Sequence, residues 1–213
     1  MSKNNFEMQK IDSRLSDLYT SDENKREKYD RWAGEYESDL VNEMDYVAHI
    51  DAARIFNEVV IDKNCRILDV ACGTGLVGEE LKKYAYSKVD GTDFSAEMLK
   101  ISKQRAVYEN LFQHDFTTAL TNPGSYDALI CVGMFSFSVP EITDMIHVIR
   151  AVKPASYCVI TVNGAAWREL SLAELVEAES SKYRFAIEQI IEAGYIQREG
   201  IDARVLIIRS PQK

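Results

Sequence analysis

Short apolar runs alternate with helical patterns from residue 65 to the end of the chain. Such runs are typical of buried β-strands, and they predict strands at residues 66–71, 88–92, 110–114, 127–132, 157–162, 195–200 and 203–209. Helical spacing is present at 76–84, from 95 onward, at 140–152, and in a mostly helical stretch up to 193. This alternation predicts a doubly wound α/β fold, in which helices cover both faces of a mostly parallel sheet that ends in an antiparallel hairpin.

The first part of the chain, residues 1–60, shows only helical spacing. We expect it to form an N-terminal helical segment, followed by a domain at 61–213 with which it makes one compact unit. Tyr29, Trp32 and Tyr36 are spaced three and four apart, so they share one helix face. This aromatic face either packs on the domain as ordinary core or closes over a bound ligand as a lid.

The charge balance of the chain limits the kinds of partner that we expect it to bind. The 213 residues include 34 acidic and 25 basic ones, which gives a formal net charge of −9. Nucleic-acid binding needs clustered Lys and Arg, and no such cluster is present, so nucleic acid is not an expected partner. The longest apolar runs, such as 205–208, are far shorter than a membrane span, and residues 1–10 are polar. We therefore expect a cytoplasmic protein that does not enter membranes, and its oligomeric state stays open.

Four cysteines occur in the chain, at Cys65, Cys72, Cys131 and Cys158. Their spacing forms neither a CxxC pair nor a zinc-finger pattern, and each lies in or beside an apolar run. We interpret them as reduced, buried, small hydrophobic residues. No metal site is expected.

A glycine-rich turn between the first strand and the next helix is the strongest chemical signal. Gly73, Gly75 and Gly78 form a GxGxxG pattern, which permits a tight turn and a close approach of the backbone to a ligand. Its place between a strand and a helix strengthens an otherwise weak pattern. Asp93 ends the second strand, 20 residues after Gly73, where its carboxylate can accept hydrogen bonds from two ribose hydroxyls. These features fit a nicotinamide dinucleotide and S-adenosylmethionine alike.

Two further acids help to separate these ligands. Asp69 lies four residues before the first glycine and is expected to face the ligand cleft. A carboxylate there repels a pyrophosphate and attracts a ligand with an ammonium and a sulfonium group, which favours S-adenosylmethionine. Asp115 follows the third strand beside Phe116. It fits an acceptor for the adenine amino group, and taken alone it fits a helix N-cap equally well.

These segments resemble the class I S-adenosylmethionine-dependent methyltransferases. LDVACGTG is similar to their first motif, GTDFSAEML to the end of the second strand and the helix after it, and HDF to the adenine contact. The likeness runs from about residue 65 to the end of the chain. YDRWAGEYESDL and the glycine turn further resemble the methyltransferase-like proteins of the Williams–Beuren syndrome region. The resemblance implies a seven-stranded Rossmann-like sheet with an antiparallel last strand, and S-adenosylmethionine as cofactor.

Carried over position by position, the resemblance implies binding roles. The glycine turn would hold the methionine end of the cofactor, and Asp93 would hold the ribose. The residues after the second and third strands would contact the adenine, and the end of the fourth strand would line the cleft beneath the sulfur. The expected cofactor-binding residues are Tyr29, Trp32, Tyr36, Asp69, Ala71, Gly73, Gly75, Asp93, Phe94, Met98, Asp115, Phe116, Val132 and Gly133.

Methyl transfer from a sulfonium is an in-line displacement in which the cofactor supplies the reactive chemistry. The protein must mainly align the acceptor and exclude water, so no indispensable catalytic side chain is predicted, and a general base stays open. As a lid, the aromatic face would add roughly 0.5–2 kcal/mol of cation–π attraction to the sulfonium. His49 and Tyr46 reach an acceptor only if their helix roofs the cleft.

The sequence thus predicts an S-adenosylmethionine-dependent methyltransferase. A small-molecule acceptor is favoured because an acidic chain of this size offers no obvious platform for a macromolecule. Two alternatives stay open. An NAD-dependent oxidoreductase would share the glycine turn and Asp93, and a non-catalytic module would bind S-adenosylmethionine without turnover.

Overall fold

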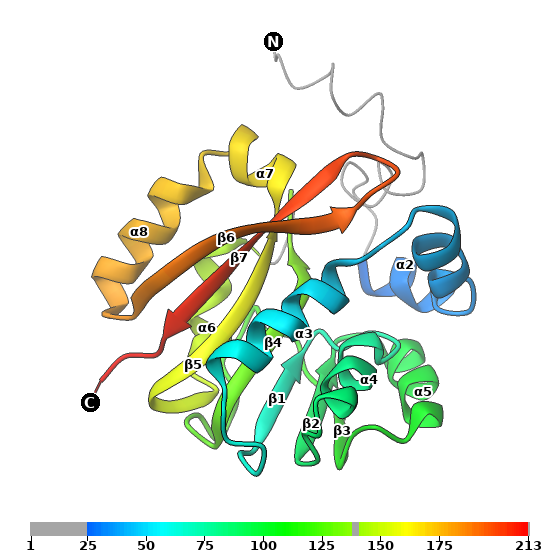
Figure 1. The fold of residues 1–213 in the computed structure, drawn as a ribbon, viewed down its shortest axis with the longest axis horizontal. Helices are drawn as coiled ribbons and strands as arrows, with labels where there is room; N and C mark the ends of the chain where they lie inside the picture. The colour runs from blue at the N-terminus through cyan, green and yellow to red at the C-terminus, as the bar shows by residue number, and fades with distance from the viewer. Residues whose placement is uncertain (1–24, 138–140, 213) are drawn as a thin grey trace.

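The computed structural model describes residues 25–137 and 141–212, and this part of the chain forms one seven-stranded sheet (Figure 1). The strand order is β3-β2-β1-β4-β5-β7-β6. Neighbouring strands pair in parallel, except that β7 is antiparallel to both β5 and β6. The strands are β1 (Ile67–Val70), β2 (Val89–Asp93), β3 (Asn110–Gln113), β4 (Tyr126–Phe135), β5 (Val152–Asn163), β6 (Ala186–Ile196) and β7 (Ile201–Arg209).

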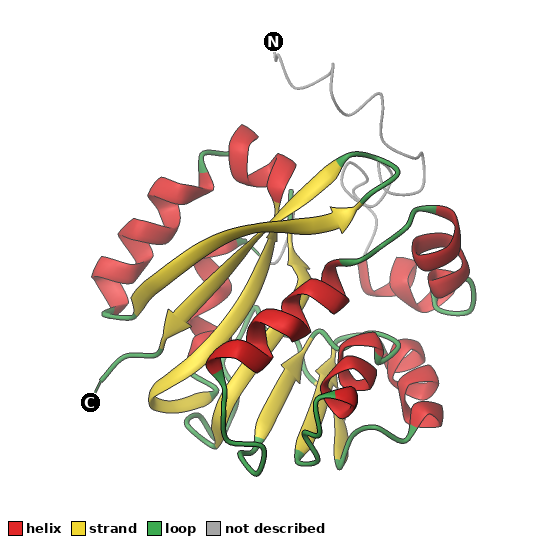
Figure 2. Cartoon of the chain, in the orientation of Figure 1, coloured by secondary structure: helices red, strands yellow, loops and turns green. Residues whose placement is uncertain are grey.

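Helices separate most of the strands and lie on both faces of the sheet (Figure 2). This arrangement confirms the predicted doubly wound α/β fold and its antiparallel last strand. The helices are α2 (Lys25–Trp32), the π-helix η3 (Ser38–Glu43), α3 (Ala48–Val59), α4 (Leu76–Lys83), α5 (Ala96–Arg105), the 3₁₀-helix η4 (Ile142–Asp144), α6 (Met145–Ile149), α7 (Gly164–Glu169) and α8 (Leu172–Tyr183).

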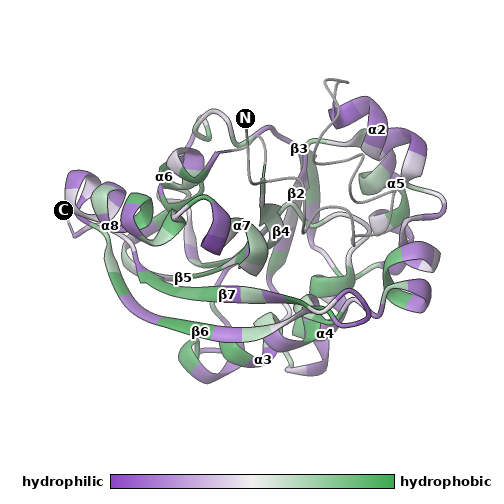
Figure 3. Cartoon of the chain, turned by 90° about the horizontal axis from the view of Figure 1, so that it is seen from above, coloured by the Kyte–Doolittle hydropathy of each residue, from purple (hydrophilic) through white to green (hydrophobic). Residues whose placement is uncertain are grey.

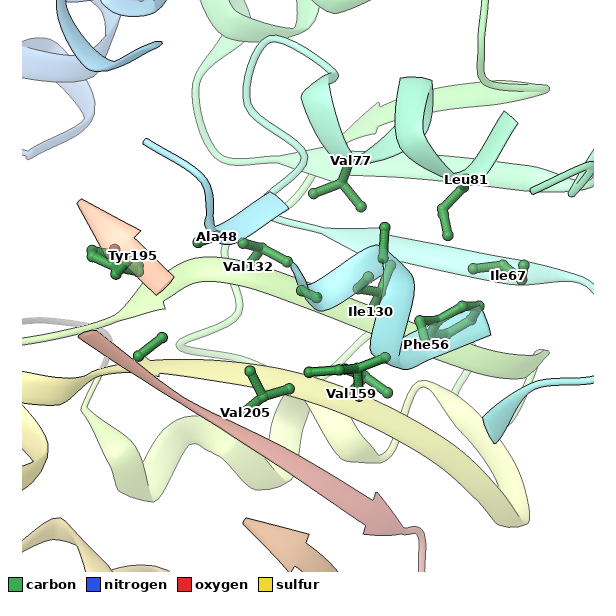
Figure 4. Packing of buried hydrophobic residues seen from close by; sticks show 14 of the residues in the cluster. Ala48, Phe56, Ile67, Val77, Leu81, Ile130, Val132, Val159, Tyr195 and Val205 are labelled. Carbon is green, nitrogen blue, oxygen red and sulfur yellow. The ribbon is translucent and has the colours of Figure 1, made fainter. Parts of the chain in front are cut away.

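Two hydrophobic clusters, one on each face of the sheet, hold the layers together. Successive residues of β1 point to opposite faces, so Ile67 enters one cluster while Leu68 and Val70 enter the other. Phe56 of α3 and Leu81 of α4 are fully buried on the first face (Figure 4). Each such side chain contributes about 1.5–3 kcal/mol relative to an exposed position, which fixes α3 and α4 against the sheet.

Helix α3 lies within the segment 1–60 that the sequence set apart, yet it packs across the sheet beside α4 (Figure 1). Ala52 and Ala53 are completely buried in this contact. Residues 1–24 of the predicted segment lie outside the described residues. The part of the predicted lid that the structure describes is therefore residues 25–46, called the cover segment below.

The prediction for the C-terminal third was wrong in one respect. The mostly helical stretch expected up to 193 ends with α8 at Tyr183, and β6 starts at Ala186 instead of near residue 195. The pairing of β6 with β7 shifts register between Ile187 and Gln189. Such an irregularity places two residues opposite one and disrupts the alternation of apolar and polar side chains, so the strand pattern is hidden in the sequence. Pairing with the apolar strand β7 then gives this segment a strand conformation in place of the expected helix.

Other boundaries differ less. The helix predicted at 140–152 corresponds to η4 and α6, which together span Ile142 to Ile149, and Pro140 lies outside the described residues. Strand β5 is longer than the predicted 157–162. All four cysteines are buried and free of disulfides, as expected.

Candidate functional site

A cavity of about 130 Å³ lies beside the carboxyl ends of β1, β2 and β4, the edge at which open α/β sheets bind ligands. The structure brings most of the expected cofactor-binding residues together in its wall. Asp69 and Gly75 do not line the cavity. The expected residues that do line it are Tyr29, Trp32, Tyr36, Ala71, Gly73, Asp93, Phe94, Met98, Asp115, Phe116, Val132 and Gly133.

Several lining residues were not in the expected set. Met134 and Ser136 follow the predicted fourth strand, so the rule that ligands bind beyond the carboxyl ends of strands points to them. Tyr195 and Ile196 come from the end of β6 and start the strand predicted at 195–200, but the sequence did not place them at the cavity. The complete set of additional lining residues is Lys25, Leu40, Tyr46, His114, Met134, Ser136, Tyr195 and Ile196.

The three glycines of the turn have different roles. Gly73 has a φ of +53°, and a Cβ added there would meet no atom within 4 Å, so its backbone is open to a ligand. A Cβ on Gly75, which has a φ of +99°, would lie 2.9 Å from Cδ of Arg105. A Cβ on Gly78 would lie 2.5 Å from the ring of Tyr108. The first glycine therefore permits ligand approach, and the other two permit close packing against α5 and the segment that follows it.

Asp93, at the end of β2, is held by backbone groups. Its Oδ2 accepts a hydrogen bond from the backbone N–H of Gly73 at 2.9 Å, and its Oδ1 accepts one from the N–H of Ser95 at 2.8 Å. Burial raises the pKa of this carboxyl to about 6, although both hydrogen bonds act to lower it. Each carboxylate oxygen has two acceptor positions, so Asp93 retains capacity for two donors from a ligand in the cavity.

Asp69 has a structural position instead of the expected one in the cleft. It is completely buried, and its Oδ2 accepts a hydrogen bond from the hydroxyl of Tyr108 at 2.6 Å. The same hydroxyl accepts a hydrogen bond from the backbone N–H of Gly78 at 3.2 Å. Burial raises the pKa of Asp69 to about 8, which disfavours the charged form of the side chain. Asp69 therefore supports the glycine turn from below, and its charge does not discriminate between the two candidate ligands.

Apolar side chains surround the cavity beyond β2 and β3. Met98 and Phe116 are almost completely buried, and Phe94 lines the same cavity. Asp115 accepts a hydrogen bond at 3.0 Å from the backbone N–H two residues further on, and it lies 3.8 Å from a guanidinium nitrogen of Arg26 in the cover segment. No helix begins at Asp115, so the helix N-cap alternative does not hold. This part of the cavity is therefore apolar and has one hydrogen-bond acceptor, Asp115, at its edge.

The aromatic residues of the cover segment form one side of the cavity. Helix α2 is mostly hydrophilic (Figure 3), so its aromatic side chains are the exceptions. The ring centroids of Trp32 and Tyr36 lie 4.9 Å apart, and the ring of Tyr29 meets Phe94 edge-on at 5.4 Å. The indole N–H of Trp32 donates to Asp39 at 2.6 Å. All three rings line the cavity and also pack against the first hydrophobic cluster, so this face has both a cavity-lining and a packing role.

The cover segment is attached to both ends of α5. At the N-terminus of α5, Asp30 Oδ1 accepts hydrogen bonds from Ser95 Oγ at 2.5 Å and from the backbone N–H of Glu97 at 3.4 Å. At its C-terminus, Arg105 forms an ion pair with Glu37. Arg105 Nε also donates to the carbonyl between the first two glycines of the turn, at 2.6 Å. One guanidinium therefore joins the cover segment to the glycine turn.

Two tyrosine hydroxyls meet at the end of β4. A Cβ added to Gly133 would lie 3.2 Å from Oη of Tyr46 and 3.7 Å from Oη of Tyr195. The two rings contact edge-on with centroids 5.5 Å apart, and His49 stacks on Tyr46 at 5.4 Å. The backbone N–H of Val47, directly after the cover segment, donates to the carbonyl of Tyr195 at 3.0 Å, which holds the end of that segment against β6. This end of the cavity therefore presents hydroxyl groups in an otherwise apolar wall.

The comparisons with known proteins agree on one family. Residues 67–155 match a family of methyltransferase domains. Methyltransferase-like protein 27 from Homo sapiens is 34% identical over 112 residues, which are 51% of this chain and 45% of that protein. A ubiquinone biosynthesis O-methyltransferase from Xanthomonas campestris pv. campestris (strain B100) is 30% identical over 92 residues, 40% of this chain and 36% of that protein. The TehB-like S-adenosylmethionine-dependent methyltransferase from Corynebacterium glutamicum ATCC 13032 Kitasato has a TM-score of 0.61 at 19% identity, covering 87% of this chain and 98% of that chain.

The chain carries a methyltransferase domain at residues 67–155, and its fold is that of the class I S-adenosylmethionine-dependent methyltransferases. The family and the fold imply S-adenosylmethionine as the cofactor of this methyltransferase, and the finer likeness to the Williams–Beuren region proteins is confirmed by the human relative. The likeness to solved structures, at 20% identity or less, shows the fold alone. This methyltransferase spans less than half the length of the curated relatives described above.

Among the helices of residues 25–137 and 141–212, none combines the length and the apolar character that crossing a membrane requires.

Proposed function

We propose that this methyltransferase transfers the methyl group of S-adenosylmethionine, by in-line displacement, to a small-molecule acceptor. The observation that carries the proposal is the cavity in which the Asp93 carboxylate, the open backbone of Gly73 and the aromatic cover segment meet. A second cavity that shares part of its wall has a volume of only about 30 Å³, against about 130 Å³ for this one.

The residues present fit this cofactor. The unused acceptor capacity of Asp93 suits two ribose hydroxyls, and the apolar part of the cavity beside Met98 suits an adenine ring. Arg105 is the guanidinium beside the glycine turn, but it is engaged by Glu37, Glu79 and a turn carbonyl. It is therefore not available to neutralise a pyrophosphate, which supports S-adenosylmethionine over a nicotinamide dinucleotide.

The chain itself binds and orients the cofactor and the acceptor, and it excludes water from them. When bound, S-adenosylmethionine supplies the electrophilic methyl group and its thioether leaving group. Asp93 fixes the ribose, and the rings of Tyr29 and Trp32 keep water from the reacting atoms. The hydroxyls of Tyr46 and Tyr195 stand at the end of β4, where they can hydrogen-bond a polar acceptor and hold it in line. A proton released by the acceptor is then taken up by solvent or by the acceptor's own basic group.

Three properties support a small acceptor. The cavity is closed on one side by the cover segment, its acceptor end is apolar and aromatic, and the chain carries a net charge of −9 without a basic cluster. The curated relatives include proteins named ubiquinone biosynthesis O-methyltransferases. A hydroxyl of a small, partly apolar molecule is therefore the first acceptor class to test.

The testing experiment has a binding step and a turnover step. Calorimetric titration with S-adenosylmethionine, S-adenosylhomocysteine and NAD identifies the cofactor. Turnover is then followed as S-adenosylhomocysteine release, by mass spectrometry, with phenols and with the low-molecular-mass filtrate of a cell extract. We expect binding of the first two ligands and release that depends on the filtrate.

Other outcomes separate the alternatives. Binding of NAD alone would make the protein an oxidoreductase and overturn the proposal. Binding of S-adenosylmethionine with no turnover by any extract fraction would indicate a binding module. Turnover only with the retained macromolecules, abolished by protease or nuclease, would overturn the small-molecule acceptor while leaving methyl transfer intact.

A further inference from the structure

Helix α2 of the cover segment contacts α5 and the loop that leads into it from Asp93 (Figure 1). The ring of Tyr29 meets the ring of Phe94 edge-on, with centroids 5.4 Å apart. The next residue of α2, Asp30, accepts a hydrogen bond through Oδ1 from Ser95 Oγ at 2.5 Å. Two consecutive residues of the cover segment therefore contact the two residues that directly follow the carboxylate proposed to bind the ribose.

Ser95 joins two carboxylates that come from different parts of the chain. Its backbone N–H donates to Oδ1 of Asp93 at 2.8 Å, and its hydroxyl donates to Oδ1 of Asp30. The same hydroxyl oxygen, at the N-cap of α5, accepts a hydrogen bond from the backbone N–H of Met98 at 3.1 Å. A hydroxyl has a single proton, so these two hydrogen bonds fix the Ser95 side chain. The two carboxylates are thus held on opposite sides of one residue.

Asp30 also lies at the amino end of α5. Its Oδ1 accepts a second, longer hydrogen bond from the backbone N–H of Glu97, at 3.4 Å, in the first turn of that helix. The amino end of a helix carries a positive partial charge, which attracts a carboxylate. This attraction and the hydrogen bond from Ser95 hold α2 in the position in which its aromatic rings line the cavity.

The charge of Asp30 acts against ionisation of Asp93. Burial is the larger cause of the raised pKa of Asp93, and the nearby carboxylate of Asp30 raises it further. The titratable side chains that interact with Asp93 from the surrounding elements are Asp30 of α2, Asp69 of β1, Cys72 before the glycine turn and Cys131 of β4. All four are acids, so none of them neutralises its charge. Asp115, which lines the same cavity, is paired with Arg26 at 3.8 Å.

A ligand that donates hydrogen bonds to Asp93 changes this balance. A like charge disfavours the ionised form of a carboxylate, whereas hydrogen bonds donated to that form favour it. In the free protein, the contact of Asp30 with Ser95 therefore brings two carboxylates together at an energetic cost. Two ribose hydroxyls at Asp93 offset that cost, so α2 is held more firmly when the ribose is bound.

We propose that Asp30 is a positioning residue that acts through Ser95 and couples closure of the cover segment to binding of the ribose at Asp93. The inference rests on the proposed function, because it takes the ribose of S-adenosylmethionine as the ligand of Asp93. Coupling between two binding events is reciprocal, so closure of the cover segment favours ribose binding to the same extent. Asp30 thereby connects the aromatic side of the cavity to the carboxylate at the end of β2.

The first test is the pH dependence of binding, measured by calorimetric titration with S-adenosylhomocysteine from pH 7.5 to pH 5. Asp30→Asn keeps an oxygen that can accept from Ser95 but removes the charge, so Asp93 should stay ionised to lower pH. Wild type should lose roughly tenfold in affinity over this range, and Asp30→Asn only roughly three- to fivefold. Glu27 is an exposed acid of the same helix, so Glu27→Gln removes an equal charge and should follow wild type.

The second test measures closure itself, as hydrogen exchange of the backbone amides of α2. Saturating S-adenosylhomocysteine should slow this exchange in wild type and in Glu27→Gln. Saturating adenosine should slow it as well, and 2′,3′-dideoxyadenosine, which lacks the two ribose hydroxyls, should have much less effect. Asp30→Ala removes the contact with Ser95 together with the charge, so most of the slowing should be lost.

Several results would overturn the inference. One is the same pH dependence in wild type and Asp30→Asn, including a loss of affinity in the variant that is equal at every pH and so indicates a structural role alone. Another is an equal change in Asp30→Asn and Glu27→Gln, which would indicate a general effect of helix charge. A third is exchange of α2 that slows equally with adenosine and with 2′,3′-dideoxyadenosine.

Failure of the proposed function gives a different result. If wild type binds neither S-adenosylmethionine nor S-adenosylhomocysteine, the proposed function fails, and titration of the Asp93 carboxyl by NMR in the free protein then tests the link between the two carboxylates. A lower midpoint for Asp93 in Asp30→Asn than in wild type would support that link without any cofactor. An unchanged midpoint would overturn the inference whether or not the cofactor binds.

Discussion

Two buried aspartates on β2, three positions apart, differ in the hydrogen-bond partners that the protein gives their carboxylates. Asp90, which is 1% exposed, accepts hydrogen bonds from Arg66 at 2.8 Å, from Asn110 at 2.7 Å and from the hydroxyl of Tyr126 at 3.0 Å. Asp93, which is 5% exposed, has only backbone N–H partners, and burial raises its pKa to about 6. The first carboxylate is satisfied by the protein, and the second retains capacity for a ligand.

The difference follows the direction of the strand. Asp90 lies near the amino end of β2 and Asp93 at its carboxyl end, where the parallel strands of an α/β sheet form their ligand-binding crevice. A buried carboxylate without a cation is unfavourable in the free protein, and such groups are found mainly at functional sites. One residue type on one strand is therefore structural at one edge of the sheet and functional at the other.

Matched alanine substitutions give the sharpest contrast, and the largest effect is expected for Asp93→Ala. It removes two hydrogen bonds between a charged acceptor and the ribose, each worth about 1.5–3 kcal/mol. Affinity for S-adenosylhomocysteine should therefore fall roughly a hundredfold or more, measured by calorimetry. The unfolding midpoint in urea should change little, because an unfavourable buried carboxylate is removed together with its backbone hydrogen bonds. A large stability loss with unchanged affinity would reverse the assignment of this residue.

Asp90→Ala should show the opposite pattern. It leaves the buried hydroxyl of Tyr126 and the amide of Asn110 without their acceptor, and we expect a loss of about 2 kcal/mol in the free energy of unfolding. The expected loss of stability is moderate because Arg66 is half-exposed, so water can solvate its guanidinium when Asp90 is absent. Urea denaturation measures the effect. Affinity for S-adenosylhomocysteine per folded molecule should stay within about twofold of wild type, and a larger change would show that the two ends of β2 are coupled.

The pH dependence of binding should sharpen the contrast further. The ionised form of Asp93 accepts both ribose hydroxyls, and its pKa of about 6 means that most of it is protonated at pH 5. Affinity for S-adenosylhomocysteine should therefore fall roughly tenfold between pH 7.5 and pH 5, a trend that Asp93→Ala should lack.

The stability of the free protein should respond to Asp93 in the opposite direction. Because the folded pKa lies above the unfolded value, the contribution of this group to stability is present below about pH 4 and is lost as the pH rises through 6. The difference in urea midpoint between wild type and Asp93→Ala should therefore shift against wild type over that range. Parallel trends in binding and stability would contradict this assignment.

The sequence predicted the fold and most of the cavity wall because these depend on local signals. Apolar runs of strand length and a glycine turn after a strand need no knowledge of distant contacts, so β1, β2 and the turn at Gly73 were found. Tyr195 starts the strand predicted at 195–200, but its place at the cavity was not predicted, because β6 begins at Ala186 and its irregular pairing with β7 leaves no clean alternation in the sequence. The second, smaller cavity, which His49 lines, could also not be predicted from the sequence, because it is formed only where α3, α4 and the turn meet.

Asp69 shows a different limit of sequence reasoning. Its position before the glycine turn was read correctly, but the direction of its side chain is set by Tyr108, a residue 39 positions away whose hydroxyl reaches it under the turn. The charge expected from the residue type is also altered by burial, which raises the pKa to about 8. A motif therefore predicted where the carboxyl lies along the chain, and neither its orientation nor its protonation state.

Asp69→Asn should accordingly produce the smallest effect on binding. An amide oxygen can still accept from Tyr108, and the side chain does not line the cavity, so affinity for S-adenosylhomocysteine should stay within about twofold at neutral pH. The raised pKa means that Asp69 contributes to stability below about pH 4 and loses this contribution as the pH rises through 8. Relative to wild type, the variant should gain urea resistance from pH 6 to pH 9. A loss of affinity as large as that of Asp93→Ala would instead place the Asp69 carboxylate in contact with the cofactor, and the sequence-based charge argument would be restored.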